Sequence, residues 1–417
     1  MERYSEYKDS GVKWLGEIPS HWEVKRLGSF FFERKEKVSD KDYAPLSVTK
    51  QGIFPQLENV AKTNDGDNRK LVKEGDFVIN SRSDRKGSSG VSGLDGSVSL
   101  INIVLQPRKV LFGPFCNYLL KSYGFIEENY RNGRGIVADL WTTRYDEMKM
   151  IKVAMPSFEE QKNISSYLDA ATSKIDKAIA MQQKMIDLLN ERKQIIIQNA
   201  VTKGLDENVE MKDSGVEWIG MIPKHWKVRR GKFLFRVVNE YSTTGQEELL
   251  TVSDRTGITP RSMKNVNMFM SESLIGYKKC QKGDICSNIM WMWHGAVGVT
   301  EYNGVISPSY GVYRQIAFSY DNKYLDYMLR LPRLVEVYGN CSTGLTESRL
   351  RLYPDDFMNL HFFVPPLEEQ KCIVLQIQKQ IIAIEKSIEN AEKLIALLQE
   401  RKQIIINEVV TGKVKVL

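Results

Sequence analysis

The chain has 417 residues, 42% of them hydrophobic and 27% charged, and a net charge of +7, which suggests two to four domains of ordinary size. No apolar run reaches the roughly 18 residues of a membrane span, and residues 1–9 lack the apolar core of a signal peptide, so we expect a cytoplasmic protein that is not bound to a membrane. Five cysteines without a CxxC pair argue against a disulfide framework and against a bound metal such as zinc.

The first element along the chain is a short motif that returns later. Residues 8–26 read KDSGVKWLGEIPSHWEVKR, and residues 212–230 read KDSGVEWIGMIPKHWKVRR. Two further motifs are repeated: SFEEQK at 157–162 returns as PLEEQK at 366–371, and LLNERKQIII at 188–197 returns as LLQERKQIII at 397–406. The chain is therefore an internal duplication.

A globular unit follows the first motif, and together they form a predicted domain over residues 1–155. Runs such as DFVIN (76–80) and VSLINIV (98–104), separated by turn signals and followed by a helical stretch, predict a mixed α+β domain. Residues 22–155 carry 22 basic and 17 acidic side chains. This excess suits binding of a polyanion, although ordinary solvated lysines and arginines explain it equally well.

The loop SRSDRKGSSG (81–90) carries the best candidates for DNA contact in this domain. Arg82 and Arg85 could reach guanine edges, whereas Lys86, Ser88 and Ser89 suit phosphate contacts. The alternative is a flexible solvated loop. A second group of basic candidates lies further along the chain: Arg131, Arg134 and Arg144.

Residues 156–203 predict one long helix. Residues 159–201 contain neither proline nor glycine, Ser157 and Glu160 form an S-x-x-E capping box, and Gly204 suits a C-terminal cap. Apolar or small residues recur at spacings of 3 and 4, which is typical of a coiled coil. They are Ile164, Leu168, Ala171, Ile175, Ala178, Met185, Leu189 and Ile196. Because the isoleucines at 195–197 point in three directions, we expect part of this surface to meet a globular unit or another protein.

The second copy repeats this order as a linker, motif and globular unit over 204–364, then a helix and tail over 365–417. Residues 226–364 carry 17 basic and 13 acidic side chains. The segment matching 80–87 is NIMWMWHG (288–295), whose Trp291, Trp293 and His294 could contact thymine methyl groups. Alternatively, the tryptophans belong to a buried core. Further polar candidates are Ser309, Tyr310, Arg349 and Arg351.

The two long helices are expected to pair with each other in antiparallel orientation, because the chain must return to begin its second unit. The predicted fold is therefore α+β, with two mixed α/β domains separated by two long antiparallel coiled-coil helices in an internal pseudo-two-fold duplication. At ~1.5 Å per residue each helix is ~60–65 Å long, which compares with ~34–36 Å for one turn of DNA. Two helices in ordinary bundles are the alternative.

The repeated W-[LI]-G-x-I-P-x-H-W motif (14–22 and 218–226), the helix start with a proline before E-Q (Pro156/Glu160-Gln161 and Pro366/Glu369-Gln370) and the L-L-x-E-R-K-Q-x-I-I helix end resemble those of the DNA-specificity subunits of type I restriction-modification systems. The resemblance covers the whole chain, twice over. It implies two target-recognition domains, each reading one half of a split double-stranded DNA site. It also implies helices that dock two modification (methyltransferase) subunits, and restriction subunits that complete the complex.

The resemblance places no cofactor in this chain, and it assigns S-adenosylmethionine, ATP and Mg²⁺ to the partner subunits. Partner contacts are expected on the helices, outside the seam between them. The candidates are Glu191, Arg192, Glu400 and Arg401.

Two other functions are compatible with parts of the sequence. Pro354-Asp355 followed by Glu369-x-Lys371 fits a loose nuclease pattern, which would require the carboxylates to converge on one Mg²⁺. A DNA-free coiled-coil scaffold is the third possibility. We expect His21 and His225, between the proline and the tryptophan of the repeated motif, to be structural residues rather than catalysts.

Overall fold

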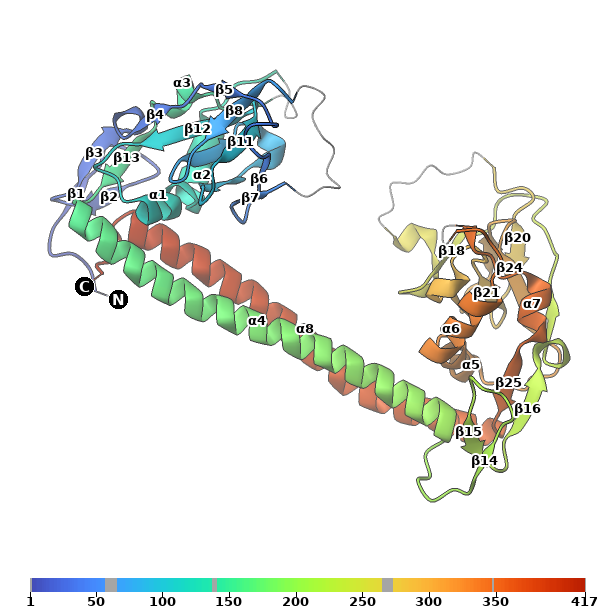
Figure 1. The fold of residues 1–417 in the computed structure, drawn as a ribbon. Coiled ribbons are helices and arrows are strands. Elements are labelled where there is room, and N and C mark those ends of the chain that lie inside the picture. Colours follow the sequence, from blue (N-terminus) through green and yellow to red (C-terminus); the bar gives the residue numbers. More distant parts are fainter. Residues whose placement is uncertain (1, 57–65, 137–140, 265–272, 347–348, 417) are drawn as a thin grey trace. The chain divides into compact units, whose positions relative to one another are not determined.

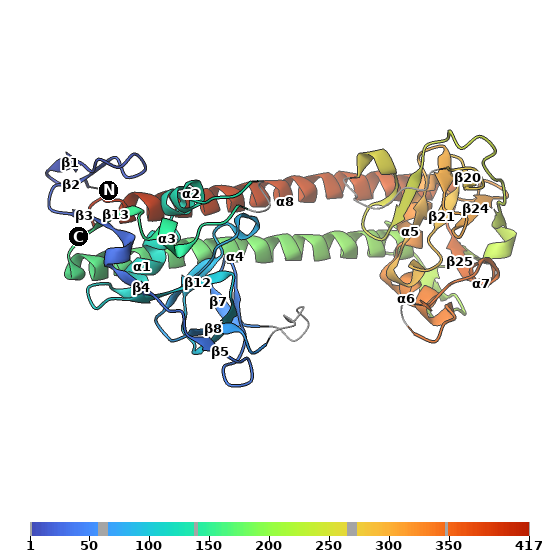
Figure 2. The same cartoon turned by 90° about the horizontal axis from the view of Figure 1, so that it is seen from above.

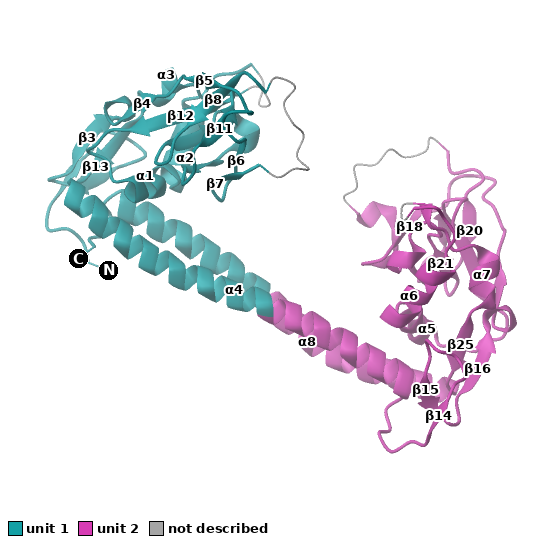
Figure 3. Ribbon diagram, in the orientation of Figure 1, with its two compact units in different colours: residues 1–184, 391–417 teal, residues 185–390 magenta. Residues whose placement is uncertain are grey.

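The computed structural model describes residues 2–416 except 57–65, 137–140, 265–272 and 347–348. The chain forms two compact units, one made of residues 1–184 and 391–417 and the other of residues 185–390 (Figure 3). Each unit combines one globular part with half of each long helix. The predicted α+β fold is confirmed. The four consecutive segments predicted from the sequence describe the order of the chain. They differ from the two compact units, because each long helix is divided between the units.

The globular part of the first unit is built on two small antiparallel sheets, ordered β10-β9-β12-β4 and β11-β8-β5, with a β6-β7 hairpin beside them. Their strands are β4 (Phe31–Glu33), β5 (Lys37–Val38), β6 (Leu46–Val48), β7 (Ile53–Pro55), β8 (Arg69–Val72), β9 (Phe77–Asn80), β10 (Ser89–Val91), β11 (Gly96–Ser99) and β12 (Asn102–Pro107). Three helices follow them: α1 (Gly113–Leu120), α2 (Tyr123–Arg131) and α3 (Tyr145–Met148). Figure 1 labels most of these strands and helices and colours them by their order along the chain.

The second unit repeats the plan with sheets β17-β24-β21-β22, β18-β19 and β20-β23. Its strands are β17 (Phe235–Val237), β18 (Leu250–Ser253), β19 (Gly257–Pro260), β20 (Lys278–Cys280), β21 (Ile285–Ser287), β22 (Val297–Val299), β23 (Gly304–Ile306) and β24 (Gly311–Gln315). Its short helices are α5 (Asn322–Leu329), α6 (Pro332–Cys341) and α7 (Pro354–Asn359).

The repeated motif forms the base of each unit. In the first unit β1 (Tyr7–Asp9) pairs with β2 (Glu17–Pro19), and β3 (Glu23–Arg26) pairs with β13 (Lys152–Met155) directly before the long helix. In the second unit the pairs are β14 (Met211–Asp213) with β15 (Met221–Pro223) and β16 (Lys227–Arg230) with β25 (His361–Val364). In each unit, a strand of the motif thus pairs with the strand that directly precedes the long helix.

The long helices are α4 (Phe158–Lys203) and α8 (Leu367–Val410), which lie side by side in Figures 1 and 2. In the first unit the start of α4, at Ile164 and Leu168, shares a hydrophobic core with Val409 and Val410 at the end of α8. In the second unit Val201 at the end of α4 shares a core with Ile373 near the start of α8. The pairing is therefore antiparallel, as expected.

The predicted seam needs one correction. Met185 is 41% exposed, whereas the next residue, Ile186, is 7% exposed. A helix with 3.6 residues per turn drifts against a strict seven-residue repeat, so the buried stripe moves by one position along α4. Ile195, Ile196 and Ile197 do diverge as predicted, since Ile195 is 51% exposed while Ile197 joins the core around Trp226.

The end of the chain closes the first unit. The Lys413 ammonium donates to the carbonyl oxygen of Leu15 at 2.7 Å, Tyr7 donates its hydroxyl to the Lys413 carbonyl oxygen at 3.2 Å, and the Lys415 N–H donates to the Glu2 carbonyl oxygen at 2.9 Å. Both ends of the chain are thus packed on the first copy of the motif.

Candidate nucleic-acid interface

A carboxylate at the start of each long helix holds the repeated motif. The Glu160 carboxylate accepts hydrogen bonds from Trp22 Nε1 at 3.0 Å and from the Tyr4 hydroxyl at 2.7 Å, and it lies 3.1 Å from His21 Nε2. Because Trp22 is fully buried, this acceptor satisfies an indole N–H that has left water. Burial, and then the hydrogen bond to Glu160, raise the pKa of Tyr4 well above its usual value.

The second copy reproduces this arrangement. Glu369 accepts from Trp226 Nε1 at 3.1 Å and lies 2.8 Å from His225 Nε2. His21 and His225 are thus hydrogen-bonding residues of a structural network, as expected. The predicted capping box is only half formed. The Glu160 N–H donates to Ser157 Oγ at 3.3 Å, but the Glu160 carboxylate accepts from Trp22 of the repeated motif rather than from the backbone of Ser157.

The glutamine that follows each glutamate holds a loop of the globular part. Gln161 Oε1 accepts from the Phe112 N–H at 2.9 Å, and Gln370 Oε1 accepts from the Asp321 N–H at 2.8 Å. Both glutamines are buried. The E-Q pair at the start of each long helix therefore fixes that helix to the start of α1 or α5.

In the first unit the predicted basic loop is a tight turn after β9. Residues Ser83–Arg85 form the short 3₁₀ helix η2, the Arg82 N–H donates to Asn80 Oδ1 at 3.0 Å, and Gly87 has a φ of +79°, which glycine adopts readily. Arg82 and Arg85 are exposed. The predicted loop is therefore an ordered turn that presents two guanidinium groups.

The structure brings the second basic cluster onto the same surface. Arg82 and Arg134 both form backbone bridges to Thr142, and the Ser83 N–H donates to the Trp141 carbonyl oxygen at 3.0 Å. The exposed side chains of this joint surface are Arg82, Arg85, Arg131, Arg134 and Arg144. Two sequence clusters about fifty residues apart thus form one basic face.

Acidic partners and aromatic rings hold part of this face. Lys86 pairs with Glu127 at 2.8 Å and lies 4.3 Å from the centre of the Tyr130 ring. Trp141 Nε1 donates to the Tyr130 carbonyl oxygen at 2.7 Å. Three of the arginines also have acidic neighbours, since Arg131 pairs with Glu128 at 2.7 Å, Arg134 with Glu147 at 3.3 Å and Arg85 with Asp84 at 3.7 Å.

Ser88 and Ser89 do not belong to this face. They are 5% and 0% exposed, because Ser89 begins β10, which pairs with β9. The expectation that their hydroxyl groups contact phosphate is therefore wrong.

In the second unit the equivalent turn presents aromatic rings. Residues Met292–His294 form the short helix η6, and Trp291 is 54% exposed while Met292 is fully buried. The His294 ring lies 3.9 Å from Trp293 and 5.1 Å from Trp291, measured between ring centres. The core interpretation of the tryptophans is therefore wrong for Trp291, because Met292 fills the core position.

The remaining candidates of the second unit lie around this turn. The Tyr310 hydroxyl accepts from Asn288 Nδ2 at 2.9 Å, and its burial raises the pKa of Tyr310. Ser309, exposed, precedes it in the loop between β23 and β24. The Arg351 guanidinium lies 4.0 Å from the Met290 sulfur. Arg349 is exposed two residues earlier, so both arginines accompany the aromatic turn.

The four candidates for partner contact, Glu191, Arg192, Glu400 and Arg401, are all exposed on the helices. Next to each charged pair, a lysine reaches across the seam. Lys193 pairs with Glu385 at 2.5 Å in the second unit, and Lys402 pairs with Asp176 at 2.7 Å in the first. These lysines occupy the same position in the two copies of E-R-K-Q.

A ridge of apolar side chains lies on the same helices, in the segment where the sequence predicts more apolar surface than the seam covers. Leu188 and Ile195 are 55% and 51% exposed in the second unit, and their counterparts Leu397 and Ile404 are 61% and 48% exposed in the first. The seven-residue spacing within each pair was visible in the sequence, but only the fold shows that the seam leaves these positions uncovered.

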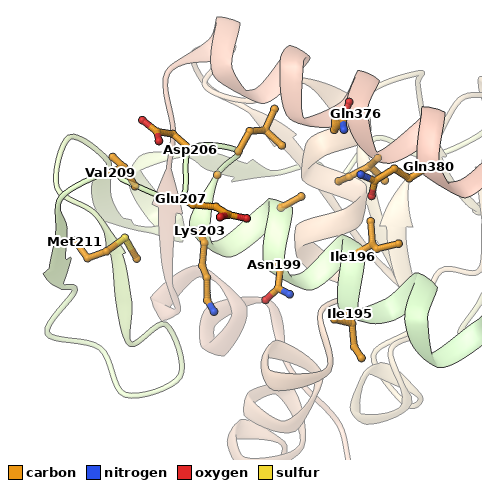
Figure 4. A pocket seen from close by; sticks show the side chains of 14 residues that line it. Ile195, Ile196, Asn199, Lys203, Asp206, Glu207, Val209, Met211, Gln376 and Gln380 are labelled. Carbon is orange, nitrogen blue, oxygen red and sulfur yellow. The ribbon is translucent and has the colours of Figure 1, made fainter. Parts of the chain in front are cut away.

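Each unit also has an open cavity beside its helices. The cavity of the second unit, about 790 Å³, lies between the end of α4, the linker after it and α8 (Figure 4). Ile195 and Ile196 line it with Lys203 and Gln380. The cavity of the first unit, about 480 Å³, is lined by Leu398, Arg401 and Ile405 from α8 and by residues of α4. Both cavities lie away from the basic and aromatic turns.

The nuclease pattern does not form a metal site. Glu369 is engaged by the motif, Lys371 pairs with Glu368 at 2.7 Å, and Asp355 lies in the first turn of α7. Within the described part of the chain, no group of three acidic, histidine or cysteine side chains is placed to hold a metal. None of the described helices is long and apolar enough to cross a membrane.

These features define a duplicated α+β protein in which each copy joins one long helix to a globular part with a distinct exposed turn. No family model matches the chain. It is 24% identical to the type I restriction enzyme MjaVIII specificity subunit of Methanocaldococcus jannaschii, over 98% of this chain and 97% of that protein. It is 23% identical to the putative MjaX specificity subunit of the same organism, over 98% of both chains.

The fold is also that of a solved chain from a study of complex assembly and conformational transition in a type I restriction-modification system. That chain matches with a TM-score of 0.68 and 15% identity, over 95% of this chain and 99% of the other. The repeated motifs lie in the same order along the full length, and the chain is thus similar throughout to type I restriction-modification specificity subunits.

Proposed function

We propose that this protein is the non-catalytic DNA-specificity subunit of a type I restriction-modification complex and reads a bipartite double-stranded DNA site. One observation carries the proposal: the duplication builds the same turn twice, basic around Arg82 and Arg85 and aromatic around Trp291. A protein that reads two different half-sites needs one scaffold in two copies with different surfaces.

The basic face of the first unit suits both kinds of DNA contact. Arginine can bind guanine O6 and N7 with two hydrogen bonds in the major groove, and it also binds phosphate. Arg82 and Arg85 are exposed on the turn itself, and Arg85 has only a long contact, 3.7 Å, with the neighbouring Asp84. Lys86, Arg131 and Arg134 lie around the turn and have closer acidic partners. We therefore assign base reading to the turn and phosphate contacts to the surrounding residues, with Arg144 among them.

The helices provide the docking surface for two modification subunits. In each unit an exposed charged pair, Glu191-Arg192 or Glu400-Arg401, lies near an exposed apolar ridge and a cavity. Apolar side chains exposed at equivalent places in both copies favour two copies of one partner. S-adenosylmethionine, ATP and Mg²⁺ would be bound by the modification and restriction subunits, and the complex would act on DNA in the cytoplasm.

The experiment that tests this function is co-expression of the chain with the modification subunit, followed by genome-wide mapping of N6-methyladenine. We expect a split motif with a fixed unspecified spacer that disappears when the chain is deleted. A stable complex that methylates no motif, and whose affinity for DNA is unchanged by charge reversal at Arg82 and Arg85, would instead support the DNA-free scaffold.

A further inference from the structure

The aromatic turn of the second unit is a surface feature whose residues could have been buried. Trp291 is 54% exposed and His294 is exposed, while Met292 between them is fully buried. One apolar residue of the turn therefore anchors it in the core, and the rings on either side remain available to a ligand.

The turn is held in a single arrangement. Trp293 Nε1 donates to the Met290 carbonyl oxygen at 3.0 Å, and the Trp291 N–H donates to the Asn288 carbonyl oxygen at 2.9 Å. Trp291 and Trp293 are nearly parallel, with an interplanar angle of 17°. Gly295, with a φ of +86°, ends the turn in a backbone conformation that suits glycine. A surface ordered before binding loses little conformational entropy on contact.

The turn is poor in hydrogen-bonding groups. An indole has one N–H donor and no acceptor, and Trp293 has already committed its donor to Met290. The paired hydrogen bonds by which arginine, asparagine and glutamine recognise guanine or adenine are therefore not available from the two indoles. The exposed His294 ring has two nitrogens, but they point in different directions and cannot both face one base edge. The only apolar group on a base edge in the major groove is the thymine 5-methyl group.

Positive charge lies next to the rings. Arg351 is 4.0 Å from the Met290 sulfur, at the beginning of the turn, and Arg349, two residues earlier in the chain, is exposed. These arginines suit phosphate contacts, which position a protein on DNA without reading sequence. A ring surface flanked by arginines fits a DNA groove better than a hydrophobic protein partner.

We infer that the second unit recognises a thymine in its half-site through contact of the 5-methyl group with the exposed Trp291 ring, supported from behind by Trp293 and His294. This inference rests on the proposed function and names the base chemistry of one half-site. It also implies that the two half-sites are read by different means, with hydrogen bonds in the first and apolar contact in the second.

The test uses the complex of the full chain with its modification subunit and the motif obtained by methylation mapping. Each thymine of the motif is replaced in turn by deoxyuridine, which lacks only the methyl group, and the Kd of each duplex is measured. The half-site of the second unit is the one whose recognition changes in Trp291→Ala. At one thymine of that half-site, we expect the deoxyuridine duplex to bind about fourfold more weakly than the thymine duplex, because burial of one methyl group is worth about that much. In that variant thymine and deoxyuridine should bind within twofold of each other.

Phe318→Ala is the matched control, because Phe318 is 90% exposed in the same unit but outside the turn, and it should preserve the preference for thymine. The inference would be overturned if deoxyuridine replaced every thymine of that half-site without loss of affinity. It would also be overturned if Trp291→Ala kept the preference for thymine over deoxyuridine. Either result would exclude methyl recognition by Trp291, including the case in which this ring inserts between bases instead. Those results would leave the proposed function intact. Only the absence of any methylated motif in the wild-type complex would remove both.

Discussion

At the scale of single residues, the repeated glutamates make long-range contacts in addition to their local role at a helix start. Glu160 and Glu369 each accept from a buried tryptophan and contact the neighbouring histidine. The sequence identified the glutamate as one half of a capping box, since capping is a local interaction. The contact with Trp22, more than a hundred residues away, depends on how the chain folds.

Replacing Glu369 by alanine should destabilise the second unit by about 1–3 kcal/mol, because the buried Trp226 N–H would lose its acceptor. Urea denaturation followed by tryptophan fluorescence would measure the loss. Glu368→Ala is the control, since Glu368 makes only an exposed pair with Lys371. Equal stability of the two variants would contradict the structural role of Glu369.

Replacing both Arg82 and Arg85 by alanine should weaken binding of the cognate duplex and relax recognition in one half-site only. Loss of an arginine that reads guanine costs about 1–3 kcal/mol, whereas loss of one that contacts phosphate reduces the salt dependence of binding by about one unit. Titration at several salt concentrations, together with methylation mapping, distinguishes the two roles. Lys25→Ala, an exposed change in β3, should alter neither measurement, and a motif unchanged in the double variant would exclude this turn from base reading.

At the scale of elements, the long helices combine a buried seam with an outer ridge. The ion pairs Lys193–Glu385 and Lys402–Asp176 join the helices at equivalent places. Exposed ion pairs contribute little stability, generally about 0–1 kcal/mol each, so their value lies in selecting one register. The seam could be approximated from the sequence because apolar spacing is regular. The sequence also predicted apolar surface beyond the seam, but it could not show which residues form the ridge, since ridge and seam residues are equally apolar.

The double variant Leu188→Glu, Leu397→Glu should reduce capture of modification subunits by at least tenfold while helix content is retained, because both side chains are exposed on the free chain. Co-purification and circular dichroism would measure these two properties. Ile382→Glu is the control, as Ile382 is 66% exposed on α8 and its counterpart in the first copy is Ser173. Full capture by the double variant would place the docking surface elsewhere.

At the scale of the whole molecule, both long helices run through both compact units, so helix length is expected to set the spacer between half-sites. Inserting seven residues into each helix, after Lys184 and after Asn390, adds about 10.5 Å to each at 1.5 Å per residue and preserves their pairing. We expect methylation of a motif with both half-sites unchanged and a spacer longer by about three base pairs. Retention of the original spacer would contradict this prediction.

The duplication, the two long helices, the mixed α+β domains and the resemblance to type I specificity subunits could be predicted from the sequence, because repeats and helical periodicity are properties of residue order. Contacts in the folded chain were needed to show that the clusters around Arg82 and Arg134 form one face, that Ser88 and Ser89 are buried, and that Trp291 faces outward while Met292 fills the core. They were also needed to show that Lys413 and Lys415 pack against the N-terminal part of the first unit. Burial and convergence depend on contacts between residues far apart in the chain, and local patterns carry no record of which distant partner covers a side chain.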